Sequence, residues 1–252
     1  MSGHSKWANI KHKKAAADAK RGKIFTKILK EITVAARTAG GDQDANPRLR
    51  TAVDNAKSNN IPFDNVERAI KKGTGELEGV HYDEYTYEGY GPNGVALILE
   101  IMTDNKQRTV SEIRHLLTKF GGNLGESGSV SWNFNRKGKI IIKNENVDED
   151  SLMMDALDSG AEDVIQDNDH FEIITSNKDF NSVKEDLKSK KYPIENADIE
   201  QIPGTTIKLN YEEAEKFFKL YELLDDHDDI QKVWDNSDIS KEILTKLEKE
   251  TN

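Results

Sequence analysis

The chain has 252 residues, of which 33% are charged and none is cysteine, so it is long enough to bury a sizeable core beneath a highly charged surface. The absence of cysteine excludes disulfides, thiolate nucleophiles and cysteine-ligated zinc. No apolar run approaches the ~20 residues that a membrane-spanning helix needs, and residues 1–6 lack the apolar region of a signal peptide. These features predict a cytoplasmic protein without a membrane partner.

The net charge of −10 conceals two oppositely charged parts of the chain. Residues 1–75 contain 16 Lys and Arg and 7 Asp and Glu, whereas the remaining residues contain 20 and 39. The first part therefore carries +9 and the second −19. Such an asymmetry indicates that the front of the chain meets a polyanion and that the rest does not. The alternative is a charged and merely solvated surface, which is what most charge runs form.

Residues 1–78 are predicted to form a basic helical domain. Apolar residues recur at helical spacing from Gly22 to Gly40, and the final glycine can adopt the positive φ that often follows a helix C-terminus. On a helical wheel, Lys23, Lys27 and Lys30 fall opposite the apolar stripe. We therefore expect this helix to pack one face and to show its cations to solvent on the other.

Two shorter helices are expected after this first one. Asn46 followed by Pro47 is typical of a helix N-cap with proline at the first helical position. A third helix is predicted between Pro62 and Gly73, and the side chains expected to face inward are Phe63, Val66 and Ile70. Residues 6–21 are too polar for a clear stripe, so they form either a mobile arm or a helix that orders on binding.

The pattern changes after Gly75 to a series of strands and helices. The expected elements up to residue 134 are an exposed strand at 82–87, a buried strand at 95–102, a helix at 108–120 and a strand on which Val130, Trp132 and Phe134 share one side. Residues 139–199 then follow the order strand, helix, strand, strand, helix, strand, which is that of a ferredoxin-like domain. A further strand, helix and strand, at 206–209, 212–224 and 230–234, complete a second set of this order with 95–134.

We therefore predict an α+β fold in which an N-terminal three-helix domain is followed by two ferredoxin-like α/β domains, one inserted in the other. The split domain is expected to comprise residues 79–136 and 204–240, and the inserted domain residues 137–203. Residues 241–252 are expected to form a charged, frayed tail.

Two motifs have non-catalytic interpretations. Gly89 to Gly94 matches the pattern G-x-G-x-x-G, but a dinucleotide site needs that loop before a helix, and here an apolar strand follows. Pro92 has no N–H to donate to a phosphate, so we predict a tight turn. The run from Asp225 to Asp229 places four carboxylates around His227 and can attract a hard cation. Because it lacks the spacing of a calcium-binding loop, we interpret it as a solvated connection.

No serine, threonine or histidine stands in a recognisable catalytic pattern. The sequence therefore predicts no catalytic residue, no metal site, no cofactor and no small-molecule substrate, and the protein is not expected to be an enzyme. The carboxylates and sheets of the acidic part suit contacts with proteins.

The cations of the first thirty residues are the strongest functional signal. Nine Lys and Arg are accompanied there by one acid, Asp18, and each cation can neutralise a phosphate and release a counterion. Trp7 either stacks on a base or anchors the segment to the helical bundle, and both roles stay open. The residues predicted to bind nucleic acid are Lys6, Trp7, Asn9, Lys11, His12, Lys13, Lys14, Lys20, Arg21, Lys23, Lys27 and Lys30.

Several segments match motifs of a known family. They are Gly3 to Lys14, Arg21 to Phe25, Asn46 to Arg50, Ile61 to Ile70, Tyr87 to Pro92, Thr103 to Thr109 and Gly128 to Val130. On these motifs the chain resembles the YebC/PmpR family, which includes the mitochondrial translational activator of cytochrome oxidase. The resemblance extends over essentially the whole chain, and its N-terminal block is highly specific.

The resemblance implies a protein with an N-terminal helical domain and two α/β domains, and a soluble regulator without known catalytic activity. Some members have been called DNA-binding transcriptional regulators, and others look like ribosome-associated translation factors. The implied partner is therefore a nucleic acid, with DNA as the first hypothesis. The alternative is ribosomal RNA, in which case the ribosome itself is a partner. A bacterial cytoplasm is the expected setting.

Overall fold

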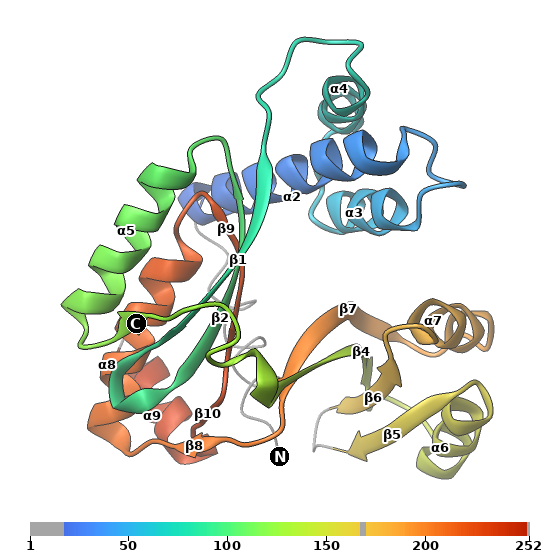
Figure 1. The fold of residues 1–252 in the computed structure, drawn as a ribbon. Coiled ribbons are helices and arrows are strands. Elements are labelled where there is room, and N and C mark those ends of the chain that lie inside the picture. Colours follow the sequence, from blue (N-terminus) through green and yellow to red (C-terminus); the bar gives the residue numbers. More distant parts are fainter. Residues whose placement is uncertain (1–17, 167–169, 251–252) are drawn as a thin grey trace. The chain divides into compact units, whose positions relative to one another are not determined.

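The computed structural model describes residues 18–166 and 170–250 (Figure 1). The chain forms two compact units, of which the first comprises Met1–Val130 and Thr206–Asn252 and the second comprises Ser131–Thr205. The second unit is thus inserted into the first, as the predicted fold class requires. No helix in the described ranges is long and apolar enough to cross a membrane.

Three helices open the first unit: α2 (Asp18–Ala39), α3 (Pro47–Ser58) and α4 (Phe63–Thr74). Figure 1 shows α3 and α4 on either side of the C-terminal half of α2. The predicted apolar stripe of the first helix is confirmed, because it forms the core between the three helices. The buried side chains of this core include Ile32, Ala35, Ala36, Leu49, Val53, Ala56 and Val66.

The junction between α2 and α3 is held by the buried side chain of Asn46. Its Oδ1 accepts the N–H of Leu49 at 3.0 Å, which confirms the predicted N-cap. Its Nδ2 donates to the carbonyl oxygens of Ala35 at 2.9 Å and Gly40 at 2.8 Å. Gly40 has φ +87°, as expected just after the end of a helix. One amide side chain therefore satisfies backbone groups at both helix ends.

The third helix differs from the prediction at both ends. Phe63 is 66% exposed instead of inward-facing, because it is the first residue of α4. The helix also continues through Gly73 and ends before Gly75, which adopts φ +85°. Gly73 has a different role: a Cβ atom built there would lie 2.4 Å from the carbonyl oxygen of Thr33. The glycine therefore permits close packing of α4 on α2.

The α/β part of the first unit contains one four-stranded sheet covered by helices. Its strands are β1 (Asp83–Tyr90), β2 (Ala96–Thr103), β3 (Asn123–Leu124) and β9 (Ile230–Asp235), in the order β3-β1-β2-β9. The helices α5 (Lys106–Lys119), α8 (Tyr211–Asp225) and α9 (Lys241–Glu250) share one core with β2 and β9. They therefore cover the same face of this sheet (Figure 1).

Two strands that the sequence predicts for this sheet are not part of it. Val130, Trp132 and Phe134 do not share a strand, because Ser131–Asn133 forms a short 3-10 helix and Trp132 is 76% exposed. Strand β8 (Ile207–Lys208) pairs with β10 (Ser237–Asp238) outside the main sheet.

One edge of β2 is occupied by β1. A tight turn joins β1 to β2, in which Gly91 donates its N–H to the carbonyl oxygen of Val95 at 2.8 Å. The turn confirms the interpretation of the glycine-rich motif. Because such a turn is local, β1 pairs with β2 along its whole length and leaves no room for a more distant strand.

The second unit has the predicted ferredoxin-like order. Its elements are β4 (Phe134–Lys143), α6 (Glu149–Asp158), β5 (Ala161–Gln166), β6 (His170–Ser176), α7 (Phe180–Ser189) and β7 (Ile194–Pro203). The antiparallel sheet has the order β5-β6-β4-β7. Both helices pack on one face of it around a core that includes Ile140, Leu152, Phe171 and Val183.

The C-terminal segment was predicted to be frayed, and this prediction is wrong for its described part. Residues Lys241–Glu250 form α9, and Leu244 and Leu247 are buried in the core of the first unit. They are spaced three residues apart, so they lie on the same side of the helix. The high proportion of charge in this segment masked a short apolar stripe.

The packing at Gly73 gives a first prediction. Gly73→Ala should lower the free energy of unfolding by about 2 kcal/mol, because its methyl group meets the backbone of α2 and cannot be accommodated by a side-chain rotation. Urea denaturation measures the change. Gly22→Ala is the matched control, since nothing lies within 4 Å of its Cβ position in the same bundle. Equal stability of the two variants would contradict the close packing.

Candidate functional site

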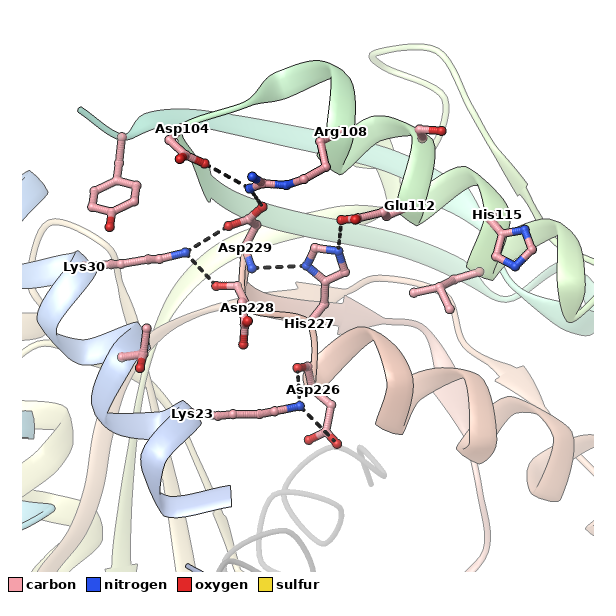
Figure 2. A pocket seen from close by; sticks show the side chains of 14 residues that line it. Lys23, Lys30, Asp104, Arg108, Glu112, His115, Asp226, His227, Asp228 and Asp229 are labelled. Carbon is pink, nitrogen blue, oxygen red and sulfur yellow. Dashed lines mark hydrogen bonds and ion pairs between the residues drawn. The ribbon is translucent and has the colours of Figure 1, made fainter. Parts of the chain in front are cut away.

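The N-terminal half of α2 lies beside the connection between α8 and β9 (Figure 2). Lys23, Lys27 and Lys30 are spaced four and three residues apart, so they project from one side of α2. We call these three residues the lysine face, and we call Asp225 to Asp229 the acidic segment. Every residue of the lysine face is hydrogen-bonded to the acidic segment.

Each lysine of the lysine face donates a hydrogen bond to a backbone carbonyl group. The accepting oxygens are those of Asp226, at 2.8 Å from Lys23 Nζ, of Asp225, bonded to Lys27 Nζ, and of Asp228, at 2.9 Å from Lys30 Nζ. A helix leaves its last carbonyl groups without partners, and they form the negative end of its dipole. The C-terminus of α8 therefore attracts ammonium groups by charge as well as by hydrogen bonding.

This contact corrects two expectations from the sequence. The lysine face does not lie open to solvent, because the side chains of Lys27 and Lys30 are only 15% and 10% exposed, although that of Lys23 is 42% exposed. The interpretation of the acidic segment as a solvated connection is wrong at Asp229, which is buried, whereas Asp228 is exposed. The helical wheel gave the correct side of α2. It could not show that another part of the chain covers that side.

The centre of the contact is the carboxylate of Asp229. Its Oδ1 accepts from Lys30 Nζ at 2.9 Å, and its Oδ2 accepts from an Arg108 guanidinium nitrogen at 2.6 Å and from Thr109 Oγ1 at 2.8 Å. Burial by itself disfavours the ionised carboxyl group. The hydrogen bonds from Arg108, Lys30 and Thr109 outweigh that effect and hold the pKa of Asp229 well below its usual value.

Tyr82 covers this ion pair from the start of the α/β part. Lys30 Nζ lies 5.1 Å from the centroid of its ring, within the range of a cation–π contact. Burial, with smaller contributions from Asp104 and Asp229, raises the pKa of the Tyr82 hydroxyl, which therefore stays protonated at neutral pH. Lys30 is thus surrounded by a carboxylate, a carbonyl oxygen and an aromatic ring.

His227 lies on the outer side of the carboxylate and is also committed to local contacts. Its Nδ1 accepts the N–H of Asp229 at 3.1 Å, so the hydrogen of the neutral ring is on Nε2, which donates to Glu112 Oε2 at 3.0 Å. Glu112, His227 and Asp229 are close enough together to hold a metal ion. Asp229, however, is already bound by Lys30 and Arg108, whose charges repel a cation. The residues present do not fit a metal.

An open pocket of about 1000 Å³ lies between α2, α5 and the acidic segment (Figure 2). Its charged lining consists of Lys23, Lys30, Arg108, Asp104, Glu112, Asp226, Asp228 and Asp229. The cations among them all pair with carboxylates, as in the bond of 2.9 Å from Arg108 to Asp104. The lining thus holds three cations, all of them paired, and five carboxylates, so the pocket does not favour a small anion.

The other predicted nucleic-acid-binding residues are not placed by the structure. Lys6, Trp7, Asn9, Lys11, His12, Lys13 and Lys14 lie outside the described residues. Lys20 and Arg21 belong to α2, but their side chains are not described. The structure therefore brings together three of the twelve predicted residues, and it does so at the acidic segment.

Sequence reasoning missed Arg108, Thr109 and Asp229 as a connected group. One signal was present, because Arg108 and Thr109 end the segment from Thr103 that matched the family motifs. The sequence pattern there predicts only that a helix begins at Arg108. Their partner, Asp229, is 120 residues or more away in the chain, and no local pattern connects the two segments.

The fold is that of a three-part protein in which a helical bundle precedes two α/β parts. Residues 5–76 match the family model of the TACO1/YebC protein N-terminal domain, and residues 82–237 match that of the TACO1/YebC second and third domain. The chain belongs to the TACO1/YebC family, as its motifs predicted.

Similar proteins come from several bacteria. The chain is 57% identical over 243 residues to a probable transcriptional regulatory protein of Desulforapulum autotrophicum, an alignment that covers 96% of this chain and 98% of that protein. It is 55% identical over 247 residues to one of Geobacter sulfurreducens, with 98% and 100% covered. The crystal structure of a conserved hypothetical protein from Aquifex aeolicus superposes with a TM-score of 0.85 at 48% identity, covering 94% of this chain and 98% of that one.

The buried carboxylate gives a second prediction. Asp229→Asn should lower the free energy of unfolding at pH 7 by about 3 kcal/mol, because it leaves Lys30 and Arg108 without their shared countercharge. Because the pKa of Asp229 is lowered in the folded protein, its contribution is present above the pKa of the unfolded chain, about 4, and is lost as pH falls below it.

Urea denaturation at pH 7 and near pH 3 measures this effect. The stability difference between the native protein and Asp229→Asn should shrink as pH falls. Asp158→Asn, at an exposed position of α6, is the control and should be close to neutral at both pH values. A difference that stays constant with pH would contradict the assignment of a charged Asp229.

Proposed function

We propose that the protein is a non-enzymatic, nucleic-acid-binding regulator of gene expression. The observation that carries this proposal is membership of the TACO1/YebC family, in which similar proteins over nearly the full chain are named probable transcriptional regulatory proteins. DNA is therefore the first candidate partner, and the cytoplasm is the proposed setting.

The distribution of charge supports a polyanionic partner. Residues 1–75 carry +9, although the protein as a whole carries −10. Three of the 16 Lys and Arg in this part form the lysine face. They bind the acidic segment, so the lysine face does not offer a free basic surface. We therefore assign the first contacts with phosphate groups to the cations of residues 6–21.

The environment of the pocket supports a role without catalysis. One of its two histidines is His227, and both ring nitrogens of this residue form hydrogen bonds, one with the amide of Asp229 and one with Glu112. Its most buried carboxylate, that of Asp229, is held in the ionised form by donors on four side chains, which makes it a poor general acid or base. These groups serve the internal contact between α2 and the α/β part.

The alternative function is that of a ribosome-associated translation factor that binds ribosomal RNA. It uses the same cations of residues 6–21, which we call the basic segment, because phosphate groups are common to DNA and RNA. The two functions differ in the partner that should be bound at physiological salt. Purified ribosomes and a duplex DNA of mixed sequence therefore distinguish them.

The third prediction concerns the basic segment. Replacing Lys11, Lys13 and Lys14 by Glu should weaken binding of a fluorescent 20-base-pair DNA duplex at least tenfold. It should also lower the slope of log K against log salt by about 0.9 for each lost phosphate contact. Fluorescence anisotropy between 50 and 300 mM salt measures both quantities. Co-sedimentation with ribosomes over the same range measures the alternative.

The control variant carries the same charge change elsewhere in the basic part. Lys57, Lys71 and Lys72 on α3 and α4 are replaced by Glu, and they should affect affinity much less. If neither duplex nor ribosome binds the native protein at any salt concentration, the proposed function is wrong. Equal losses in the two variants would show that total charge, and not the basic segment, determines binding.

A further inference from the structure

The lysine face resembles a phosphate-binding surface that is already occupied. Its first and last lysines are seven residues apart on α2, or roughly 10 Å at 1.5 Å per residue. A nucleic-acid strand offers one phosphate for about every 3.4 Å of its axis, so a strand along α2 can supply a phosphate to each lysine. The acidic segment supplies oxygen acceptors to the same lysines, in the form of carbonyl groups and carboxylates.

The three pairs differ in how strongly they are held. Lys30 lies 2.9 Å from Asp229 Oδ1, and both side chains are at most 10% exposed. Separating a buried pair of this kind is strongly unfavourable, because an uncompensated charge remains in the interior. This inner pair therefore stays closed under conditions that keep the protein folded.

The two outer ion pairs have longer distances to the carboxylates, although Lys23 and Lys27 also donate to backbone carbonyl oxygens. The Nζ atom of Lys27 lies 3.9 Å from the nearest carboxylate oxygen of Asp225, and that of Lys23 lies 3.7 Å from the one of Asp226. Both carboxylate distances exceed that of a direct hydrogen bond. The pair of Lys23 is also the more exposed, and exposed ion pairs contribute little to stability and are screened by salt. A competing polyanion can replace these contacts.

The lysine face is also continuous in sequence with the basic segment. Lys20 and Arg21 immediately precede Lys23, and Asp18 is the one acid among the first thirty residues. A strand bound to residues 6–21 is therefore bound next in sequence to Lys23, the most exposed residue of the lysine face. The order of increasing burial, from Lys23 to Lys30, is the order in which such a strand would meet the pairs.

We propose that the acidic segment acts as an internal substitute for phosphate, and that nucleic acid displaces it from Lys23 and Lys27 while the pair of Lys30 and Asp229 stays closed. This inference rests on the proposed function and adds to it the regulation of the same site. Binding and displacement are linked, so whatever weakens the outer pairs raises the affinity for nucleic acid. The acidic segment thereby limits non-specific binding by the basic part.

The test is a variant in which Asp225, Asp226 and Asp228 are replaced by Asn, with Asp229 retained. Its affinity for the 20-base-pair duplex, and for a single-stranded RNA of 20 nucleotides, should rise about tenfold at 100 mM salt. The charge-matched control replaces Glu149 by Gln and Asp150 and Asp158 by Asn on α6, in the second unit. Its affinity should change much less, although its net charge changes equally. Urea denaturation of both variants verifies that they fold.

A second readout follows the contact directly. Hydrogen exchange of amides from residues 226 to 230 and from 22 to 28 should accelerate when duplex or RNA is added to the native protein. Exchange at residues 30–36 should not change, because the inner pair persists. Comparing the exchange measured with duplex and with RNA shows which nucleic acid opens the contact more effectively.

The outcomes separate the inference from the proposed function. If nucleic acid binds and the aspartate variant is unchanged, or if both variants gain equally, the displacement is wrong and the proposed function stands. If exchange in the acidic segment slows on binding, the segment contacts nucleic acid instead of leaving it, and the inference is again wrong. If no variant binds either probe, both the proposed function and the inference fail.

Discussion

A buried carboxylate that is ionised must be surrounded by donors, and this requirement at Asp229 organises the first unit. One of its oxygens binds Lys30 of α2, and the other binds Arg108 and Thr109 of α5. A single side chain therefore joins the helical part to the α/β part, and it does so with donors from elements far apart in the sequence. The ion pair with Asp229 places Lys30 beside the connection between α8 and β9.

The same arrangement gives the lysines of α2 different roles. Lys30 is structural, because its charge is required inside the protein. Lys23 lies at the exposed end of the contact, where water and salt already compete for it. A regulator that binds a polyanion through a basic front part needs a means of limiting unspecific binding. In the displacement proposed above, the acidic segment is that means, since it presents its oxygens to the lysines that follow residues 6–21.

Local patterns in the sequence predicted most of the fold. Asn46 and Gly40 mark helix ends by their own chemistry, and the order of elements between 139 and 199 is sufficient to identify the ferredoxin-like unit. The errors arose where a residue's role depends on a distant partner. Gly73 looks like a helix stop, but the backbone of α2 requires a glycine there. The lysine face looks solvated because the acidic segment is some 200 residues further along the chain.

The most direct test of this account is a pair of double-mutant cycles for Lys30 with Asp229 and for Lys23 with Asp226, in which each lysine is replaced by Met and each aspartate by Asn. Urea denaturation at pH 7 gives the coupling free energy of each pair. The account predicts about 2–3 kcal/mol for the inner pair and at most a few tenths of a kcal/mol for the outer pair. Equal and small couplings would contradict it, because the buried carboxylate would then not hold the two parts together.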